Sequence, residues 1–553
     1  MQRTRMATYG LLLMILATTG ATAARAADDP LAWVRHIVVI YQENHSFDNL
    51  YGLWGSVGDQ KVNGVESADP SLALQVDQDG RPFKCLLQND PKLTSPPLAA
   101  TCSDTGNGSA FRSAFPNRPF LIDPYVGQDQ LTRDLVHRFY QEQYQINGGR
   151  QNRYVAGSDA AGLTMAYYDT RRLPVYQWLQ RPEAPRYVVL DNFFTAAFGG
   201  SFLNHLWLIS ARTPQLPGAP ADLHSVVDGN GMPVGGADRP YPLYLSPVAG
   251  VKDKPLTAAC PAPAPGILCG DFVVNTLQPQ SQPYHPETRS VRLQLTTPTI
   301  GERLSEAGID WAWYAGGWSN AAGRVGAPGW TNGTAPLAAT ASSARPCPDP
   351  NAMPRAAWPN CPGKLFQFHH QPFVYHAGYA EGTRARADHL LDEVEFFVAA
   401  RTGKLKPVSF VKPIGEENEH PGYATVQQGS RHLVELLEAI VSGPQAQDTL
   451  VIVTYDENGG SWDHVPPPGQ GATPGPHDAF GPGTRLPALA VSARFARSGV
   501  DHTQYDTTSI LRTIERRFGL APVGASYAGM PPRDARVNDV SPAVEVAGLR
   551  DRR

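Results

Sequence analysis

Two adjacent carboxylates, Asp456 and Glu457, stand directly after an apolar run at residues 450–453. A strand that is buried in a parallel sheet ends in this way when its carboxyl edge carries chemistry. Hard divalent cations prefer carboxylate oxygens, and a cation at the edge of an α/β sheet indicates a hydrolytic site. Asp463 and His464 follow a few residues later. We expect this pair to contact the metal ligands and orient them, without binding the metal itself.

A second pair of oxygen donors, Glu43 and Asn44, follows another apolar run at residues 37–41. Taken by itself, the pair is more typical of a loop carboxylate and of an asparagine in an Asx turn. Asp456 and Glu457, however, follow another predicted strand. Parallel strands present their carboxyl ends at one edge of the sheet, so the two pairs of residues are expected to form one metal site.

Four segments resemble signatures of one family. Residues 43–49, Glu-Asn-His-Ser-Phe-Asp-Asn, resemble the E-N-x-S-F-D signature of the bacterial phosphoesterase family that contains acid phosphatases and phospholipases C. Residues 456–467 are similar to its D-E-x-G-G-x-x-D-H-V-x-P-P signature, and residues 481–487 and 505–511 match its C-terminal pattern. The resemblance, over residues 35–520, implies the alkaline-phosphatase-like superfamily: a metal-dependent α/β fold with a hydroxyl nucleophile.

Ser201 is the nucleophile that the resemblance implies, since residues 198–205 match the family's small-residue turn followed by Asn-His. Glycines let the chain turn sharply and present a serine at a helix start, where free N–H groups favour a phosphate. A neighbouring cation would lower the pKa of the hydroxyl and activate it. The alternative is a capping serine without chemistry. Asn204 either binds a phosphate oxygen or shapes the turn.

The same resemblance implies a set of metal ligands, namely Glu43, Asn44, Ser201, Asp456 and Glu457. The histidine-rich sets of two-zinc members cannot be assembled from the matched motifs. One oxygen-rich centre per site is therefore favoured, with calcium, magnesium or manganese ahead of zinc, although a mixed site stays open.

Histidines supply the remaining chemistry, because phosphoryl transfer builds charge on the equatorial and leaving oxygens. In a mildly acidic site, protonated imidazoles can stabilise that charge and deliver a proton. The family-like blocks predict four such residues, against the commoner structural role of a lone histidine: His137, His369, His370 and His420. We expect structural or surface roles for His36, His45, His389, His432 and His502.

Strands that alternate with helices must position these residues. Apolar runs predict buried strands at 37–41, 187–190, 309–314, 408–411, 450–453 and 488–491. Apolar stripes predict helices over 389–401, 431–441 and 508–518. This alternation is typical of an α/β fold, in which a mostly parallel sheet carries helices on both faces.

The rest of the chain predicts export. Basic residues precede an apolar stretch at 7–24, and Ala24-Arg25-Ala26 fits a cleavage site, so we expect a signal peptide at 1–26 and a periplasmic or secreted protein. We expect residues 27–553 to form one catalytic domain, with loop-rich insertions at 55–128 and 214–296 that cap the active edge. Six cysteines allow fifteen pairings, and their spacing favours the local ones: Cys85–Cys102, Cys260–Cys269 and Cys347–Cys361.

The composition of the chain limits its possible binding partners. The net charge is −4 and the mature chain contains no long apolar stretch, so neither nucleic acid binding nor a membrane span is expected. The leading hypothesis is a secreted acid phosphatase that hydrolyses small phosphomonoesters through a phosphoserine, because residues 131–169 look more like that branch. A phospholipase C that cleaves phospholipid headgroups is the alternative. A non-catalytic binding protein on this scaffold would be expected to lack one of the acidic residues or the serine.

Overall fold

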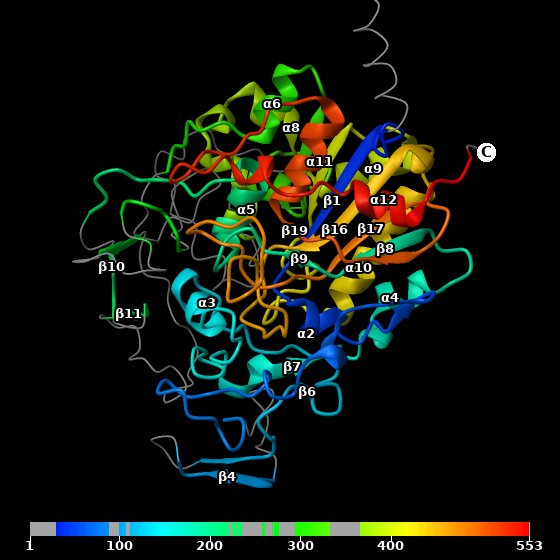
Figure 1. Cartoon of the computed structure of the whole chain (residues 1–553). Helices are drawn as coiled ribbons and strands as arrows, with labels where there is room; N and C mark the ends of the chain where they lie inside the picture. The colour runs from blue at the N-terminus through cyan, green and yellow to red at the C-terminus, as the bar shows by residue number, and fades with distance from the viewer. Residues whose placement is uncertain are drawn as a thin grey trace, which may run out of the picture.

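The computed structural model describes residues 29–87, 99–106, 111–220, 224–228, 231–234, 257–259, 268, 270–275, 293–331 and 365–551. Its centre is an eight-stranded sheet in the order β14-β13-β15-β1-β16-β17-β8-β18 (Figure 1). In that order the strands are Leu390–Asp392, Trp311–Ala315, Val408–Lys412, His36–Gln42, Thr449–Tyr455, Ala488–Ser492, Arg186–Leu190 and Gly499–Asp501.

Most of this sheet is parallel. Parallel pairing joins β14, β13, β15, β1 and β16, and β18 pairs parallel with β8. Strand β17 runs antiparallel to its two neighbours, β16 and β8. All six apolar runs that predicted strands lie in this sheet, which confirms a mostly parallel α/β fold. The short edge strands β14 and β18 were not predicted.

Helices cover both faces of the sheet, since alternate residues of β1 enter different cores. Val39 packs in a core with α5 (Ser201–Ser210), α6 (Ile300–Glu306) and α11 (Thr508–Phe518). Val38 packs in the other core with α4 (Pro174–Leu179), α9 (Glu393–Thr402) and α10 (Val426–Val441). The predicted helices at 431–441 and 508–518 are therefore confirmed.

The predicted helix at 389–401 begins too early. Residues 390–392 form β14, and α9 starts only after Asp392, whose side chain accepts a hydrogen bond from the N–H of Val394. The predicted apolar stripe consisted of Leu390, Leu391, Val394, Phe397 and Val398. It is wrong for α9, because Val394 and Val398 are exposed while Phe396 and Ala400 are buried. Pairing with β13 holds the leucines before α9 in a strand, which a helical period does not reveal.

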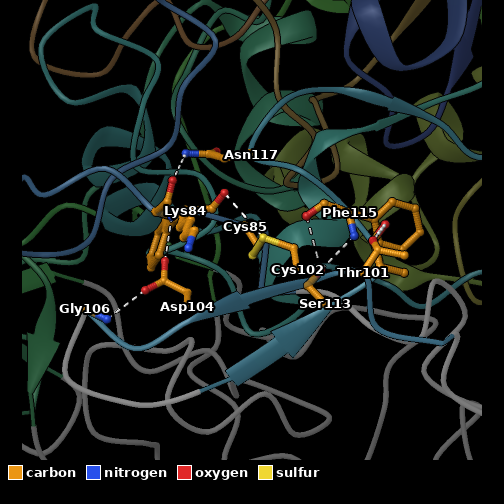
Figure 2. Close-up of a disulfide and its surroundings, with 11 residues drawn as sticks. Lys84, Cys85, Thr101, Cys102, Asp104, Gly106, Ser113, Phe115 and Asn117 are labelled. Carbon is orange, nitrogen blue, oxygen red and sulfur yellow. Dashed lines mark hydrogen bonds between the residues drawn. A yellow bond between two sulfur atoms is a disulfide. The ribbon is translucent and has the colours of Figure 1, made fainter.

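Short strands of the two expected insertions lie away from the sheet, whereas Gln60 of the first insertion reaches it and accepts a hydrogen bond from the N–H of Val500 in β18. In Figure 1, β4 (Cys102–Asp104) lies at the bottom and β10 (His224–Val227) and β11 (Pro233–Val234) at the left. The predicted Cys85–Cys102 disulfide is present and ties β4 to the chain beside it (Figure 2). The other two predicted pairs and the signal peptide lie outside the described residues, and the division into domains stays a prediction. No helix in the described ranges is long and apolar enough to cross a membrane.

Candidate active site

The carboxyl ends of β1 and β16 meet at one edge of the sheet, because the two strands pair in parallel along their whole length. Glu43 and Asn44 follow β1, whereas Asp456 and Glu457 follow β16. The carboxylates of Glu43, Asp456 and Glu457 each place one oxygen within 4.8 Å of the others, and all three side chains are fully buried. The two predicted pairs of oxygen donors therefore share one pocket of negative charge.

Ser201 joins this cluster from the first position of α5. Its hydroxyl lies 3.3 Å from Oε2 of Glu43 and 3.5 Å from Oε1 of Glu457, and it can donate to either. Gly199, with a φ of 92°, makes the turn before the helix, and a Cβ there would lie 2.4 Å from the backbone nitrogen of Phe139. Only glycine fits this conformation and this close approach, so the turn that presents the serine depends on it.

A divalent cation fits this set of oxygens. Oδ1 of Asn44 and Oδ2 of Asp456 are buried without a hydrogen-bond partner, and such oxygens are costly unless a positive group meets them. Burial, and then the charge of Asp456, raises the pKa of Glu43 and of Glu457 well above the ordinary range. A cation would stabilise both the unpartnered oxygens and the ionised forms of Glu43 and Glu457. A set of oxygen ligands suits calcium, magnesium or manganese.

Two residues that the sequence did not single out also reach the carboxylates. Lys412, at the end of β15, donates to Oε1 of Glu43 and to the carbonyl of Tyr41 at 3.0 Å. His205 places Nε2 3.7 Å from the same Glu43 oxygen, and its Nδ1 donates to the Ser201 carbonyl at 2.8 Å. Both carried a signal: Lys412 directly follows a predicted strand, and His205 lies four residues after Ser201, on the same helix face.

The predicted histidines surround this centre. Nε2 of His137 lies 3.4 Å from Oε1 of Glu457, and Nε2 of His370 lies 3.3 Å from Oε1 of Glu43. His420 forms a 2.9 Å hydrogen bond between its Nε2 and the side-chain amide of Asn44. His369 packs edge-on against the ring of His370, at 4.5 Å between ring centres.

Burial lowers the pKa of each of these four imidazoles and so disfavours its protonated form. It lowers the pKa of His369 to about 3 and that of His420 to about 4, and the mutual repulsion of the rings adds to this for His369. The pKa values of His137 and His370 are lowered for the same first reason. The structure thus opposes the expectation that these rings are protonated at mildly acidic pH, unless a bound anion raises their pKa values.

Asn204 supports the turn, which favours the second of its two predicted roles. Its Oδ1 accepts from the hydroxyl of Thr195 at 2.7 Å and from the N–H of Ala197 at 2.9 Å. Its Nδ2 donates to the carbonyls of Ala197 and Gly199. With both side-chain atoms engaged, Asn204 orders the turn that presents Ser201 rather than reaching for a phosphate.

Asp463 and His464 tie the two motif loops together. Asp463 accepts from the N–H of Asp48 at 3.0 Å and pairs with the buried guanidinium of Arg485, while His464 bonds to the Asp48 carboxylate at 2.6 Å. No hydrogen bond between this pair and the candidate metal ligands is seen in the described part of the chain. Their support therefore acts through loop geometry, not by orienting the ligands directly as expected.

The other histidines take the structural or surface roles that were expected. His45 bonds to Asn49 and to the Glu419 carbonyl, and His432 pairs with Glu393. His36 lies against the Lys406 carbonyl, His389 stacks on Trp311, and His502 pairs with Asp191 at the surface.

Sequence comparison decides the family. The model of the phosphoesterase family matches residues 34–521. The chain belongs to the phosphoesterase family. It is a hydrolase that acts on phosphoric ester bonds.

Several relatives of this phosphoesterase are known. Phospholipase C A of Mycobacterium tuberculosis is 23% identical over 542 residues, covering 93% of this chain and 78% of that protein. Non-specific phospholipase C6 of Arabidopsis thaliana is 30% identical over 154 residues, covering 23% and 29%. Among solved structures, an alkaline phosphatase superfamily protein from Vibrio parahaemolyticus matches with a TM-score of 0.22 and 12% identity, over 42% of this chain and 51% of that one. A TM-score this low adds nothing to the description of the fold.

Proposed function

We propose that this phosphoesterase is a metal-dependent phosphatase, which hydrolyses small phosphomonoesters through a phosphoserine at Ser201. The observation that carries the proposal is the position of the Ser201 hydroxyl, within hydrogen-bonding distance of two buried carboxylates at a helix start. A hydroxyl that is placed between a proton acceptor and free backbone N–H groups can attack phosphorus while its proton leaves.

The proton path follows from the contacts of Glu457. Ser201 Oγ forms the new bond to phosphorus as its proton passes to Oε1 of Glu457, the oxygen that also lies 3.4 Å from His137. The ester oxygen leaves as the alcohol after it takes a proton from this pair of groups. In the second half, water attacks the phosphoserine, its proton returns by the same path, and phosphate and free Ser201 are released.

A divalent ion completes the proposal. Glu43, Asn44, Ser201, Asp456 and Glu457 would hold it, and it would lower the pKa of the serine hydroxyl and neutralise charge on the phosphoryl oxygens. The buried, unpartnered oxygens of Asn44 and Asp456 support this choice of ligands. Calcium, magnesium or manganese would suit the set.

Phospholipase C activity is the second candidate, and it is favoured by the names of the relatives. Monoester hydrolysis is favoured by residues 131–169, the segment that looks like the phosphatase branch. This segment borders the site: it supplies His137, and the Gln151 carbonyl accepts a hydrogen bond from the indole of Trp462. Phosphate release from para-nitrophenyl phosphate, compared with headgroup release from phosphatidylcholine, separates the two.

The nucleophile is tested by Ser201→Ala, with Ser210→Ala as the matched control. Both serines are buried on α5, but Ser210 donates to the Leu206 carbonyl at the far end of the helix. We expect Ser201→Ala to lower kcat by about 10³-fold or more and Ser210→Ala to leave it within about threefold. Trapping of labelled phosphate on the wild type and not on Ser201→Ala completes the test. Full activity of Ser201→Ala would exclude this nucleophile.

We also propose export to the periplasm or beyond. The Cys85–Cys102 disulfide supports an oxidising compartment, because such bonds are rare where thiols are kept reduced. N-terminal sequencing of protein recovered outside the cytoplasm should begin at Ala27. A chain that stays cytoplasmic and begins at Met1 would contradict export.

A further inference from the structure

Lys412 is the one cation that touches the candidate metal ligands among the described residues. Its side chain is 1% exposed, and its ammonium contacts Oε1 of Glu43. The other Glu43 oxygen, Oε2, is the one that receives the Ser201 hydroxyl. The two oxygens of this carboxylate therefore have different partners: one faces a fixed positive charge, and the other faces the nucleophile and the remaining carboxylates.

Beside Lys412 stands a second group of possible ligands. His205 and His370 stack at 4.8 Å with nearly parallel rings, and their Nε2 atoms lie 3.7 and 3.3 Å from Oε1 of Glu43. Both Nε2 atoms are buried without a hydrogen-bond partner. Because Nδ1 of His205 donates to the Ser201 carbonyl, its Nε2 carries the lone pair, which is the form of histidine that binds metals.

These two imidazoles and Glu43 form a mixed nitrogen and oxygen set, which suits zinc more than calcium or magnesium. Its carboxylate oxygen is already taken by the ammonium of Lys412. A divalent ion on that oxygen would lie against a like charge that has no water to screen it. Removal of the ammonium would leave a buried carboxylate oxygen and two unpartnered Nε2 atoms within 4.8 Å of one another.

The charges of the site also favour one divalent ion together with Lys412. The three buried carboxylates of the site, Glu43, Asp456 and Glu457, are balanced by one divalent ion together with one ammonium. A second divalent ion would leave a buried excess of positive charge, which is costly.

We propose that Lys412 is a built-in cation that takes the place of a second metal ion, so that each site holds one divalent ion on Glu43 Oε2, Asp456 and Glu457. The inference rests on the metal-dependent function proposed above. It assigns Lys412 as a positioning residue, and it identifies Glu43, His205 and His370 as a zinc site that the lysine keeps closed.

The test counts metal ions in purified protein that is equilibrated with zinc or manganese and analysed by plasma mass spectrometry. We expect about one ion per chain in the wild type, and about two zinc ions in Lys412→Met, which keeps the apolar stem but loses the charge. Lys412→Arg should return the count to one, and Lys412→Met combined with His370→Ala should do so as well. Lys406→Met, which removes a lysine paired with Asp310 outside the site, is the matched control and should keep one ion.

If Lys412→Met does not fold, the single variant His370→Ala still tests whether the one bound ion lies on the carboxylates and not on His370. The variant should keep its ion, because His370 is not among the proposed ligands. Two ions in the wild type, loss of the ion from His370→Ala, or a single zinc in folded Lys412→Met would each overturn the role of Lys412. A wild-type chain without any divalent ion would overturn the metal-dependent function as well, so the two failures are distinguishable.

Discussion

Glu142 is a buried carboxylate that holds the turn before Ser201, and Glu142→Gln tests that role. From α3 (Phe139–Ile146), its Oε2 accepts the N–H of Gly199 at 2.5 Å. Its Oε1 accepts the N–H and the hydroxyl of Thr484 at 2.7 and 2.8 Å. Glutamine has the same size but only one acceptor, so either Gly199 or Thr484 would face a donor instead of an oxygen.

The expected change in stability depends on pH. Burial raises the pKa of Glu142 from 4.5 to about 7. A raised pKa contributes stability that is fully present below pH 4.5 and is lost as the pH rises through 7. At about 1.4 kcal/mol per pH unit, the loss is about 3 kcal/mol by pH 8. Glutamine never ionises, so the free energy of unfolding of the variant, relative to the wild type, should rise by about 3 kcal/mol between pH 4.5 and pH 8.

The catalytic activity of Glu142→Gln should fall at high pH, although its stability relative to the wild type rises. Without the carboxylate, Gly199 is held less firmly and Ser201 is presented less precisely, so kcat at pH 8 should fall by about 10- to 100-fold. Urea denaturation near pH 5 and pH 8, together with kcat on a phosphomonoester, measures both effects. Glu306→Gln, at a carboxylate 67% exposed, is the control and should change neither. A stability difference that is the same at both pH values, or an unchanged kcat, would refute the reasoning.

Three further predictions concern the scaffold. Arg485→Met should lower the free energy of unfolding by about 3–5 kcal/mol in urea denaturation, because it strands buried carboxylates that the guanidinium pairs with; a loss below about 1 kcal/mol would contradict this. Burial lowers the pKa of His432, but the hydrogen bond and charge of Glu393 outweigh this and raise it from 6.5 to about 9. His432→Gln should therefore cost about 3 kcal/mol at pH 6 and little above pH 10, so a cost that does not depend on pH would refute the ion pair. Cys102→Ser opens a loop of 17 residues and should lower stability by about 3 kcal/mol, an effect that reduction of the wild type should reproduce.

The strands and the turn that precedes Ser201 could be predicted because their signals are local. A β-branched apolar run specifies a buried strand without reference to its neighbours, and the six predicted runs lie in the sheet. Two glycines before Ser201 specify a turn into a helix in the same local way. The proximity of Glu43 to Asp456 could also be predicted, because parallel strands present their carboxyl ends at the same edge of a sheet.

Long-range contacts could not be predicted in this way. Nothing in the order of residues says that Lys412 meets Glu43, since that contact exists only because β15 pairs beside β1. Glu142 reaches Gly199 from another helix, and the exposed side of α9 depends on β14 pairing before it.

The family, the α/β architecture and the residue types of the site follow from the sequence, because motifs and periodicity are properties of neighbours in the chain. Packing of the folded chain sets which oxygen of Glu43 faces Ser201 and which faces Lys412, and it places the Asn204 side chain in hydrogen bonds within the turn. It also lowers the pKa values of His369 and His420, since burial is a property of the packed chain and not of any motif.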